Sequence, residues 1–228
     1  MLSHCENKSK GRIQSEPQKY IKFTTQNMVR VYPHGFRINS SNFSPLEHWA
    51  VGAQLVALNY QSSNSIEMEF NRALFALNGG CGYVLKPHHL RAASNVTKKQ
   101  QLKLKIFSVK VGGQEFTDLN SSDYYVTVEF YAASRSKEEF STSNGLFRFL
   151  YSPVSEYEFS DIEHPELTFV KFILKEKTFG GMFSKTIGTC MISVKAMKEG
   201  NRLISVIKTI LLTSFFACFR KSNCVTTK

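Results

Sequence analysis

The sequence predicts an α/β unit followed by an all-β unit. Before about residue 95, short apolar runs alternate with helix signals, in the order strand, helix, strand, helix, strand. From residue 101 onward, short segments alternate apolar and polar residues with a period of two. The chain has 228 residues, of which 42% are hydrophobic, so each unit is able to bury a core.

Three strands and two helices are predicted in the first unit. Residues 30–32 (RVY) are β-prone and end at Pro33, and residues 54–58 (QLVAL) and 83–85 (YVL) have the length and apolar character of buried strands. A first helix is predicted to begin near Ser44, which can cap it, with Pro45 as the first helical residue and Glu47 placed to bond back to the cap. This helix is predicted to end near Gly52. A second helix is predicted from apolar residues at helical spacing, and it ends at the sequence NGG: Ile66, Phe70, Ala73, Leu74.

The second unit is predicted to be a β-sandwich. Leu102, Leu104 and Ile106 alternate with polar residues, and residues 124–131 alternate in the same way. Residues 167–174 are apolar on both faces, which indicates a central strand. Residues 92–100 are predicted to be a linker, residues 101–220 the sandwich and residues 221–228 a tail. Further strands are predicted at residues 157–159, 187–191, 203–207 and 211–219.

The net charge of +11 predicts attraction to an anionic partner, either nucleic acid or acidic lipid headgroups. The polar first ten residues do not form a signal peptide, and Lys208 interrupts the apolar run 203–219, which favours a buried strand over a membrane span. The five cysteines form no CxxC pair, so we interpret them as free thiols.

Several segments of the first unit match motifs of one known family. Residues 30–45 (RVYPHGFRINSSNFSP) resemble the signature R-I-Y-P-x-G-x-R-x-D-S-S-N-Y-x-P of the Y half of phosphoinositide-specific phospholipase C. The resemblance continues in register through Trp49, Gly52, residues 54–61 (QLVALNYQ) and residues 78–87 (NGGCGYVLKP). Residues 101–220 resemble the C2 domain that follows in this family, through strand order and spacing.

This resemblance implies a definite fold and activity. In the family, X and Y halves together close a TIM-type barrel with its active site at the carboxyl ends of the strands. Residues 1–91 are therefore expected to be a partial barrel and residues 101–220 a C2 domain. The family hydrolyses phosphatidylinositol 4,5-bisphosphate to diacylglycerol and inositol trisphosphate in intracellular signalling. Its catalytic histidines and calcium ligands belong to the X half, so no catalytic residue and no bound calcium are expected in this chain.

Arg30 and Tyr32 are the strongest candidate site residues. They lie two apart on a strand and therefore point to the same face, next to the strand's end. By resemblance, Arg30 contacts a ring phosphate of the lipid headgroup, Tyr32 packs against the inositol ring, and Ser3 contacts the same phosphate through its hydroxyl. From spacing alone, Arg30 as a solvated strand residue and Tyr32 as a core residue are an equal alternative, and for Ser3 the alternative is an unstructured terminus.

Other candidates concern the membrane and metal ions. Phe36 matches an apolar rim residue that dips into the membrane, and a turn aromatic packed locally is the alternative. Asp123 matches one calcium-ligand position of C2 domains and is a weak metal candidate. The loop predicted at residues 175–178 (KEKT) has lysines where two aspartates are wanted, so weak or absent calcium binding is expected. These lysines favour anionic headgroups, and ordinary solvated charges are the alternative. Four histidines fall in no catalytic motif and are interpreted as structural or solvent-facing: His34, His48, His88 and His89.

The expected partners are a phosphoinositide headgroup, an anionic membrane surface and the X half of the barrel. The expected location is the cytoplasm, peripheral at the inner face of the plasma membrane. A non-catalytic phosphoinositide-binding regulator is the alternative function. A nucleic-acid binder is the third hypothesis, and the sequence lacks the aromatic and basic pattern of base stacking, so no nucleic acid is expected.

Overall fold

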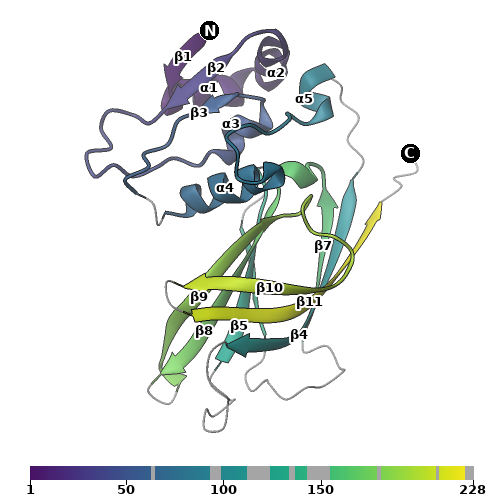
Figure 1. Cartoon of the computed structure of the whole chain (residues 1–228). Coiled ribbons are helices and arrows are strands. Elements are labelled where there is room, and N and C mark those ends of the chain that lie inside the picture. The colour runs from purple at the N-terminus through teal and green to yellow at the C-terminus, as the bar shows by residue number, and fades with distance from the viewer. Residues whose placement is uncertain are drawn as a thin grey trace. The chain divides into compact units, whose positions relative to one another are not determined.

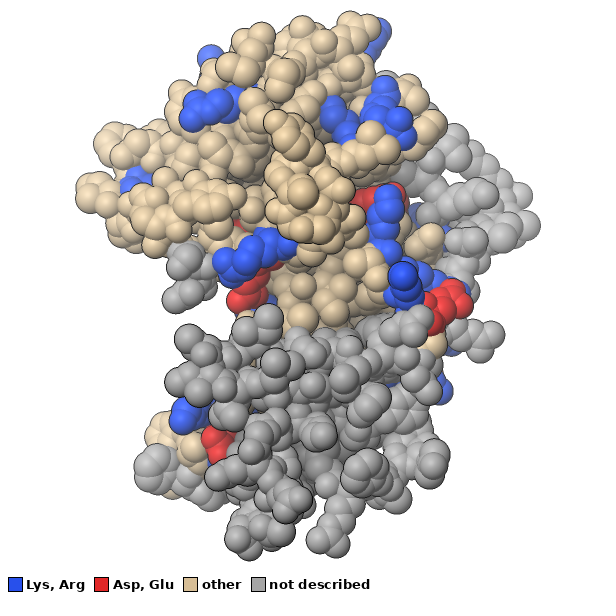
Figure 2. Space-filling view, in the orientation of Figure 1, with Lys and Arg blue, Asp and Glu red and all other residues tan. Residues whose placement is uncertain are grey.

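The computed structural model of the chain describes residues 1–62, 65–92, 99–111, 124–133, 137–142, 155–178, 181–208 and 211–223. All other residues are grey in Figure 1 and Figure 2. The chain divides into two compact units, of which the first is Met1–Thr97 with Ala132–Arg135 and the second is Lys98–Tyr131 with Ser136–Lys228.

The first unit contains a three-stranded parallel sheet and several helices (Figure 1). The sheet order is β1-β2-β3, with β1 at Leu2–Cys5, β2 at Val29–Tyr32 and β3 at Leu55–Val56. The helices are α1 (Glu6–Ser15), α2 (Pro17–Gln26), α3 (Leu46–Ala50), α4 (Ile66–Phe75) with the 3₁₀ turn η1 (Ala76–Asn78), and α5 (His88–Ala92).

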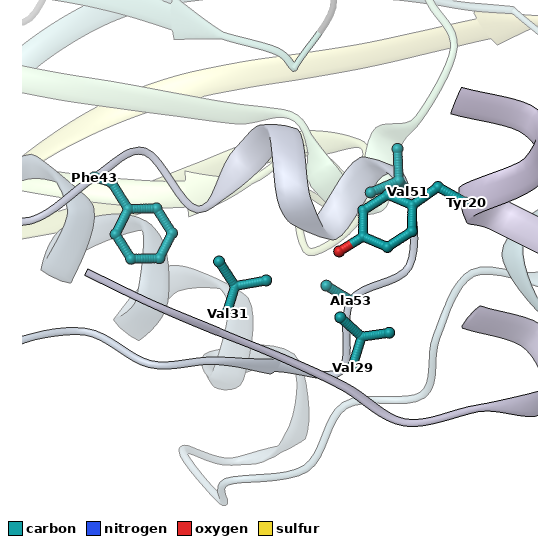
Figure 3. Close-up of a cluster of buried hydrophobic side chains, with 6 residues drawn as sticks. All are labelled: Tyr20, Val29, Val31, Phe43, Val51 and Ala53. Carbon is teal, nitrogen blue, oxygen red and sulfur yellow. The ribbon is translucent and has the colours of Figure 1, made fainter. Parts of the chain in front are cut away.

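One face of this sheet is packed and the other is exposed. Val29 and Val31 of β2 are fully buried, in a cluster with Tyr20 of α2, Phe43 and Val51. Figure 3 shows these side chains pointing toward one another between the strand and the helices. The alternating residues of β2 are exposed, because successive side chains of a strand point to opposite faces.

Several predictions for the first unit need correction. The strand predicted at residues 54–58 is only the pair Leu55–Val56, and Leu55 is 40% exposed rather than buried. Residues 83–85 form no strand, and the side chains of Tyr83 and Leu85 are exposed. Apolar runs predict burial, but no other segment in the described part of this unit covers the side chains of Leu55, Tyr83 and Leu85, which remain exposed.

The helix predictions were closer. Helix α4 and η1 end at Gly79, whose φ of +65° is the left-handed conformation that glycine adopts without strain. Helix α3 begins at Leu46, with Pro45 in the cap position, and Ser44 does not cap it, because no side-chain cap bond is present. The polar first ten residues form β1 and the first half of α1, neither of which was predicted.

The described residues of the second unit form eight strands, which are β4 to β11. Their hydrogen-bonded order is β6-β5-β8-β9-β10-β11-β4-β7. A single residue pair, Ile207 with Thr189, joins β9 to β10, and we treat the two halves on either side of this junction as two sheets, β6-β5-β8-β9 and β10-β11-β4-β7. The strands are β4 (Gln100–Val111), β5 (Tyr124–Tyr131), β6 (Glu138–Ser141), β7 (Ser155–Ile162), β8 (Phe169–Thr178), β9 (Phe183–Ser193), β10 (Gly200–Lys208) and β11 (Leu211–Asn223), and the 3₁₀ turn η2 is Pro165–Leu167.

The two sheets share a core of aromatic and aliphatic side chains. Phe130 of β5 stacks on Phe159 of β7 with a ring-centroid separation of 4.4 Å, and both are buried. Leu102, Leu104 and Ile106 of β4 are also buried, as their alternation predicted. This arrangement is a two-sheet sandwich, as predicted for this region.

Other parts of the second unit differ from the prediction. Thr127 and Glu129, on the second face of β5, are also buried, and Thr127 Oγ1 lies 3.0 Å from Ser141 Oγ of β6. Strand β6 was not predicted, and β11 extends to Asn223, beyond the predicted start of the tail at residue 221. Residues 175–178 are the end of β8, paired with β9, and not a loop.

Candidate functional site

The candidate site residues lie on the exposed face of the parallel sheet. In the parallel register, Ser3 of β1 lies opposite Arg30 of β2, and Arg30 lies opposite Leu55 of β3. These three residues therefore form one row across the sheet. Tyr32 is two residues further along β2 on the same face, at the carboxyl end where Pro33 ends the strand.

The side chains of this row are close enough to act together. Arg30 Nη1 donates a long hydrogen bond of 3.4 Å to Ser3 Oγ, and Arg30 Cζ lies 5.3 Å from the centroid of the Tyr32 ring. Tyr32 is 36% exposed and Arg30 is exposed. No carboxylate of the described residues forms an ion pair with Arg30.

This arrangement suits an anionic group attached to a ring. A guanidinium without a carboxylate partner offers its donors to phosphate oxygens, and a hydroxyl beside it adds another donor. The exposed aromatic face provides a flat apolar wall for a ring that carries the phosphate. The sequence prediction brought Ser3, Arg30 and Tyr32 to one place, and it missed Leu55, which was expected to be buried.

An ion pair anchors the loop that follows β2. Arg37 donates from Nε to Glu6 Oε1 at 2.5 Å and from Nη2 to Glu6 Oε2 at 2.7 Å, which is a two-bond fork. Its Nη1 donates to Ser41 Oγ and to the carbonyl of Asn42. Glu6 also accepts the backbone N–H of His34 at 2.8 Å. These hydrogen bonds hold the pKa of the Glu6 carboxyl below the usual value, and the bonds from Arg37 are the main cause.

Two large apolar side chains of this loop are directed into solvent. Phe36, the predicted rim residue, is 85% exposed, and its ring lies 5.0 Å from that of His34. Ile38 is 93% exposed and was not predicted as a functional residue. Its apolar side chain within a polar turn is a signal that sequence inspection could have used.

A chain of buried polar side chains lies on the packed side of the sheet. His4 Nε2 is 2.8 Å from Tyr20 Oη, Tyr20 Oη is 3.1 Å from Ser9 Oγ, and Ser9 Oγ is 2.8 Å from His48 Nδ1. Burial lowers the pKa of His48 to about 4 and also lowers the pKa of His4. Both histidines are therefore neutral near pH 7, and this network is part of the packing.

The four histidines interpreted as structural or solvent-facing lie outside the row of Ser3, Arg30 and Leu55. His88 and His89 lie in α5, and His48 is buried in α3. No cluster of three or more His, Cys, Asp or Glu side chains that could hold a metal ion occurs among the described residues. Asp123 lies outside the described residues. No helix in the described part of the chain is long and apolar enough to cross a membrane.

Comparisons with known proteins agree with the sequence motifs. Residues 1–89 match the family described as phosphatidylinositol-specific phospholipase C, Y domain. Human 1-phosphatidylinositol 4,5-bisphosphate phosphodiesterase gamma-2 is 33% identical over 214 residues, which cover 89% of this chain and 16% of that protein. The human delta-1 enzyme is 30% identical over 219 residues, covering 89% of this chain and 28% of that protein.

The similarity extends to a solved structure and to a third relative. The crystal structure of PLC21 from L. pealei superimposes with a TM-score of 0.80 and 26% identity, covering 99% of this chain and 30% of that one. The human eta-2 phosphodiesterase is 47% identical over 85 residues, or 37% of this chain and 6% of that protein. The chain thus spans less than a third of each of these relatives.

Proposed function

We propose that this chain, which belongs to the phosphoinositide-specific phospholipase C family, binds the headgroup phosphates of phosphatidylinositol 4,5-bisphosphate for hydrolysis to diacylglycerol and inositol trisphosphate. It corresponds to the Y domain of the family and to the C2-like region that follows. The row of Ser3 and Arg30, with Tyr32 beside it, carries this proposal. In this function Arg30 and Ser3 bind a ring phosphate and Tyr32 packs against the inositol ring.

The exposed face of the sheet supports a role as part of a larger barrel. Parallel sheets are usually covered on both faces, yet here Arg30, Tyr32 and Leu55 remain exposed while Val29 and Val31 are buried. We infer that residues 1–91 are part of a TIM-type barrel, that an X half supplies the other strands, and that the exposed face then lines the barrel interior. Tyr32, beside this row, lies at the carboxyl end of β2, and barrel enzymes bind their substrates at the carboxyl ends of the strands.

The acid–base groups and the calcium ion of the reaction are assigned to the X half. The described residues of this chain do not fit a calcium site, since they place no cluster of carboxylates around a common point. This chain's own residues bind and orient the phosphates, and Arg30 offsets their negative charge within the binding site.

We further propose that residues 92–100 link the barrel part to a C2 domain at residues 101–220, followed by a tail, and that the chain acts at the inner face of the plasma membrane. The net charge of +11 favours the anionic cytoplasmic leaflet. On the face of the first unit that Figure 2 shows, the Lys and Arg side chains form separate groups rather than one continuous stripe. Phe36 is proposed to enter the membrane interface next to the headgroup site.

A reconstitution assay tests this function. The 228-residue chain and a separately produced X half are added, alone and together, to vesicles that contain phosphatidylinositol 4,5-bisphosphate, in the presence of calcium. Inositol trisphosphate release is expected only with both parts. Arg30→Lys should lower the rate about tenfold to a hundredfold, because it keeps the charge but loses the planar fork. Lys19→Ala, which removes an exposed charge elsewhere on the unit, should leave the rate unchanged.

The same assay separates the alternative function. A non-catalytic regulator would bind phosphoinositide vesicles through Arg30 and the basic surface without inositol trisphosphate release in the presence of the X half. Release by the chain alone would contradict the assignment of the acid–base groups to the X half. A shift with DNA that falls with salt, without vesicle binding, would instead favour a nucleic-acid partner.

A further inference from the structure

We propose that Ile38 is a second membrane-inserting residue beside Phe36, an inference that rests on the proposed membrane function. The two side chains are 93% and 85% exposed, and one residue separates them. No other pair of large apolar side chains in the loop between β2 and α3 is this exposed. Together they form an apolar tip, defined here as Phe36 and Ile38.

Local hydrogen bonds fix the shape of the loop that carries the apolar tip. Arg37 N–H donates to the carbonyl of His34 at 3.0 Å, Ile38 N–H to the carbonyl of Phe36 at 2.9 Å, and Ser40 N–H to the carbonyl of Arg37 at 3.0 Å. Ser40 has a φ of +56°, a left-handed conformation that lets the chain reverse direction. The tip is therefore a compact turn, and these backbone donors are satisfied without the membrane.

The side chain between the two apolar residues points the other way. Arg37 is held against Glu6 by two hydrogen bonds, and its side chain is only 29% exposed. Because Arg37 is drawn toward α1, its neighbours Phe36 and Ile38 are left outside the turn. The charges of Arg37 and Glu6 are already paired, so insertion of the apolar tip does not require either charge to be desolvated without its partner.

A bilayer suits this tip better than a protein partner. A stable protein–protein interface buries about 800 Å² on each side, whereas two side chains on a convex turn offer far less. Lipid acyl chains, in contrast, accept single protruding side chains, and each buried methylene strengthens partitioning. Arg30 lies on β2, just before this loop, so insertion of the tip would hold Arg30 and the row of Ser3, Arg30 and Leu55 at the membrane surface.

Tryptophan substitution tests the insertion directly. The chain has one tryptophan, Trp49, which is buried and should not respond to lipid. Ile38→Trp is mixed with vesicles of phosphatidylcholine, phosphatidylserine and phosphatidylinositol 4,5-bisphosphate, and emission is recorded with and without brominated phosphatidylcholine. We expect a blue shift and strong quenching. The matched control is Leu85→Trp, because Leu85 is also an exposed apolar residue of the first unit, and it should show neither change.

Vesicle sedimentation supplies the second measurement. Ile38→Ser should weaken vesicle partitioning about tenfold, and Leu85→Ser should leave it unchanged. If Ile38→Trp sediments with vesicles but its introduced indole is not quenched, or if the two serine variants bind alike, Ile38 does not insert and only the present inference fails. If the unsubstituted chain does not bind these vesicles, the proposed membrane function fails, and the insertion of Ile38 fails with it.

Discussion

Lowering the pH from 7 to 5 is expected to destabilise the amino-terminal unit through His48. Its imidazole is buried, with 3% of the residue exposed, and shares one hydrogen bond at Nδ1 with Ser9 Oγ. Burial is the main cause that lowers its pKa, while Glu6 acts in the opposite direction, and His4 and Lys10 add to the lowering. The folded unit therefore keeps His48 neutral at pH values where the unfolded chain protonates it.

The size of the effect follows from proton linkage. With a pKa of 6.5 in the unfolded chain and about 4 in the folded unit, the free energy of unfolding falls by about 2 kcal/mol between pH 7 and pH 5. The sign is fixed by the lowered pKa: the unfolded state binds more protons below pH 6.5, so stability is highest above that value and declines as the pH falls toward 4.

Urea unfolding followed by the fluorescence of Trp49 measures this change. Trp49 adjoins His48 in α3 and is the single tryptophan of the chain, so its signal reports the amino-terminal unit. The control is His48→Leu, which cannot titrate and loses about 1 kcal/mol for the missing hydrogen bond at every pH. Equal pH dependence of the unsubstituted chain and His48→Leu between pH 7 and 5 would refute the reasoning, because the titration would then belong to other groups.

Three further predictions concern stability. Gly52→Ala should lower the free energy of unfolding of the first unit by about 2 kcal/mol or more, since Gly52 has a φ of +80° and a Cβ there would lie 2.6 Å from Thr24 Oγ1. Gly79 has a similar φ but open space around it, so Gly79→Ala should lower that free energy by only about 1 kcal/mol in the same Trp49 assay. Equal losses for the two variants would rule out the clash with Thr24. Glu6→Gln should lower the same free energy by about 1–3 kcal/mol, because Arg37 loses its charged partner, and unchanged stability would show that the fork is unimportant. In the second unit, Phe130→Ala should lower the free energy of unfolding, measured by thermal denaturation, by about 3–5 kcal/mol. Glu158→Gln, in the exposed ion pair with Lys103, should lower it by less than about 1 kcal/mol. Comparable losses for the two variants would contradict a major contribution of the Phe130–Phe159 stack to stability.

Local periodicity predicted much of the secondary structure. The alternation of Leu102, Leu104 and Ile106 and the helical spacing of Phe70 and Leu74 correspond to buried faces. These patterns are reliable because strand and helix geometry set the direction of each side chain from its neighbours alone. The same geometry explains why Arg30 and Tyr32 could be assigned to one face.

Apolar composition was less reliable where burial depends on distant segments. Leu55, Tyr83 and Leu85 were expected in strands, and all three are exposed. Thr127 and Glu129 alternate with apolar residues along β5, yet both are buried, with Tyr131 Oη and Lys137 Nζ donating to Glu129. Burial of a strand face depends on which segments pack on it, and single-strand patterns do not contain that information.

The sequence by itself determined the family, the sandwich of the second unit and the candidate residues Ser3, Arg30, Tyr32 and Phe36, because short motifs and side-chain periodicity are local properties. Only the tertiary structure decided that Ser3 pairs in register with Arg30, and that Glu6 holds Arg37 across 31 residues so that Ile38 is left exposed. Such pairings depend on the path of the chain between the partners, and their free energy arises only after folding brings the groups together.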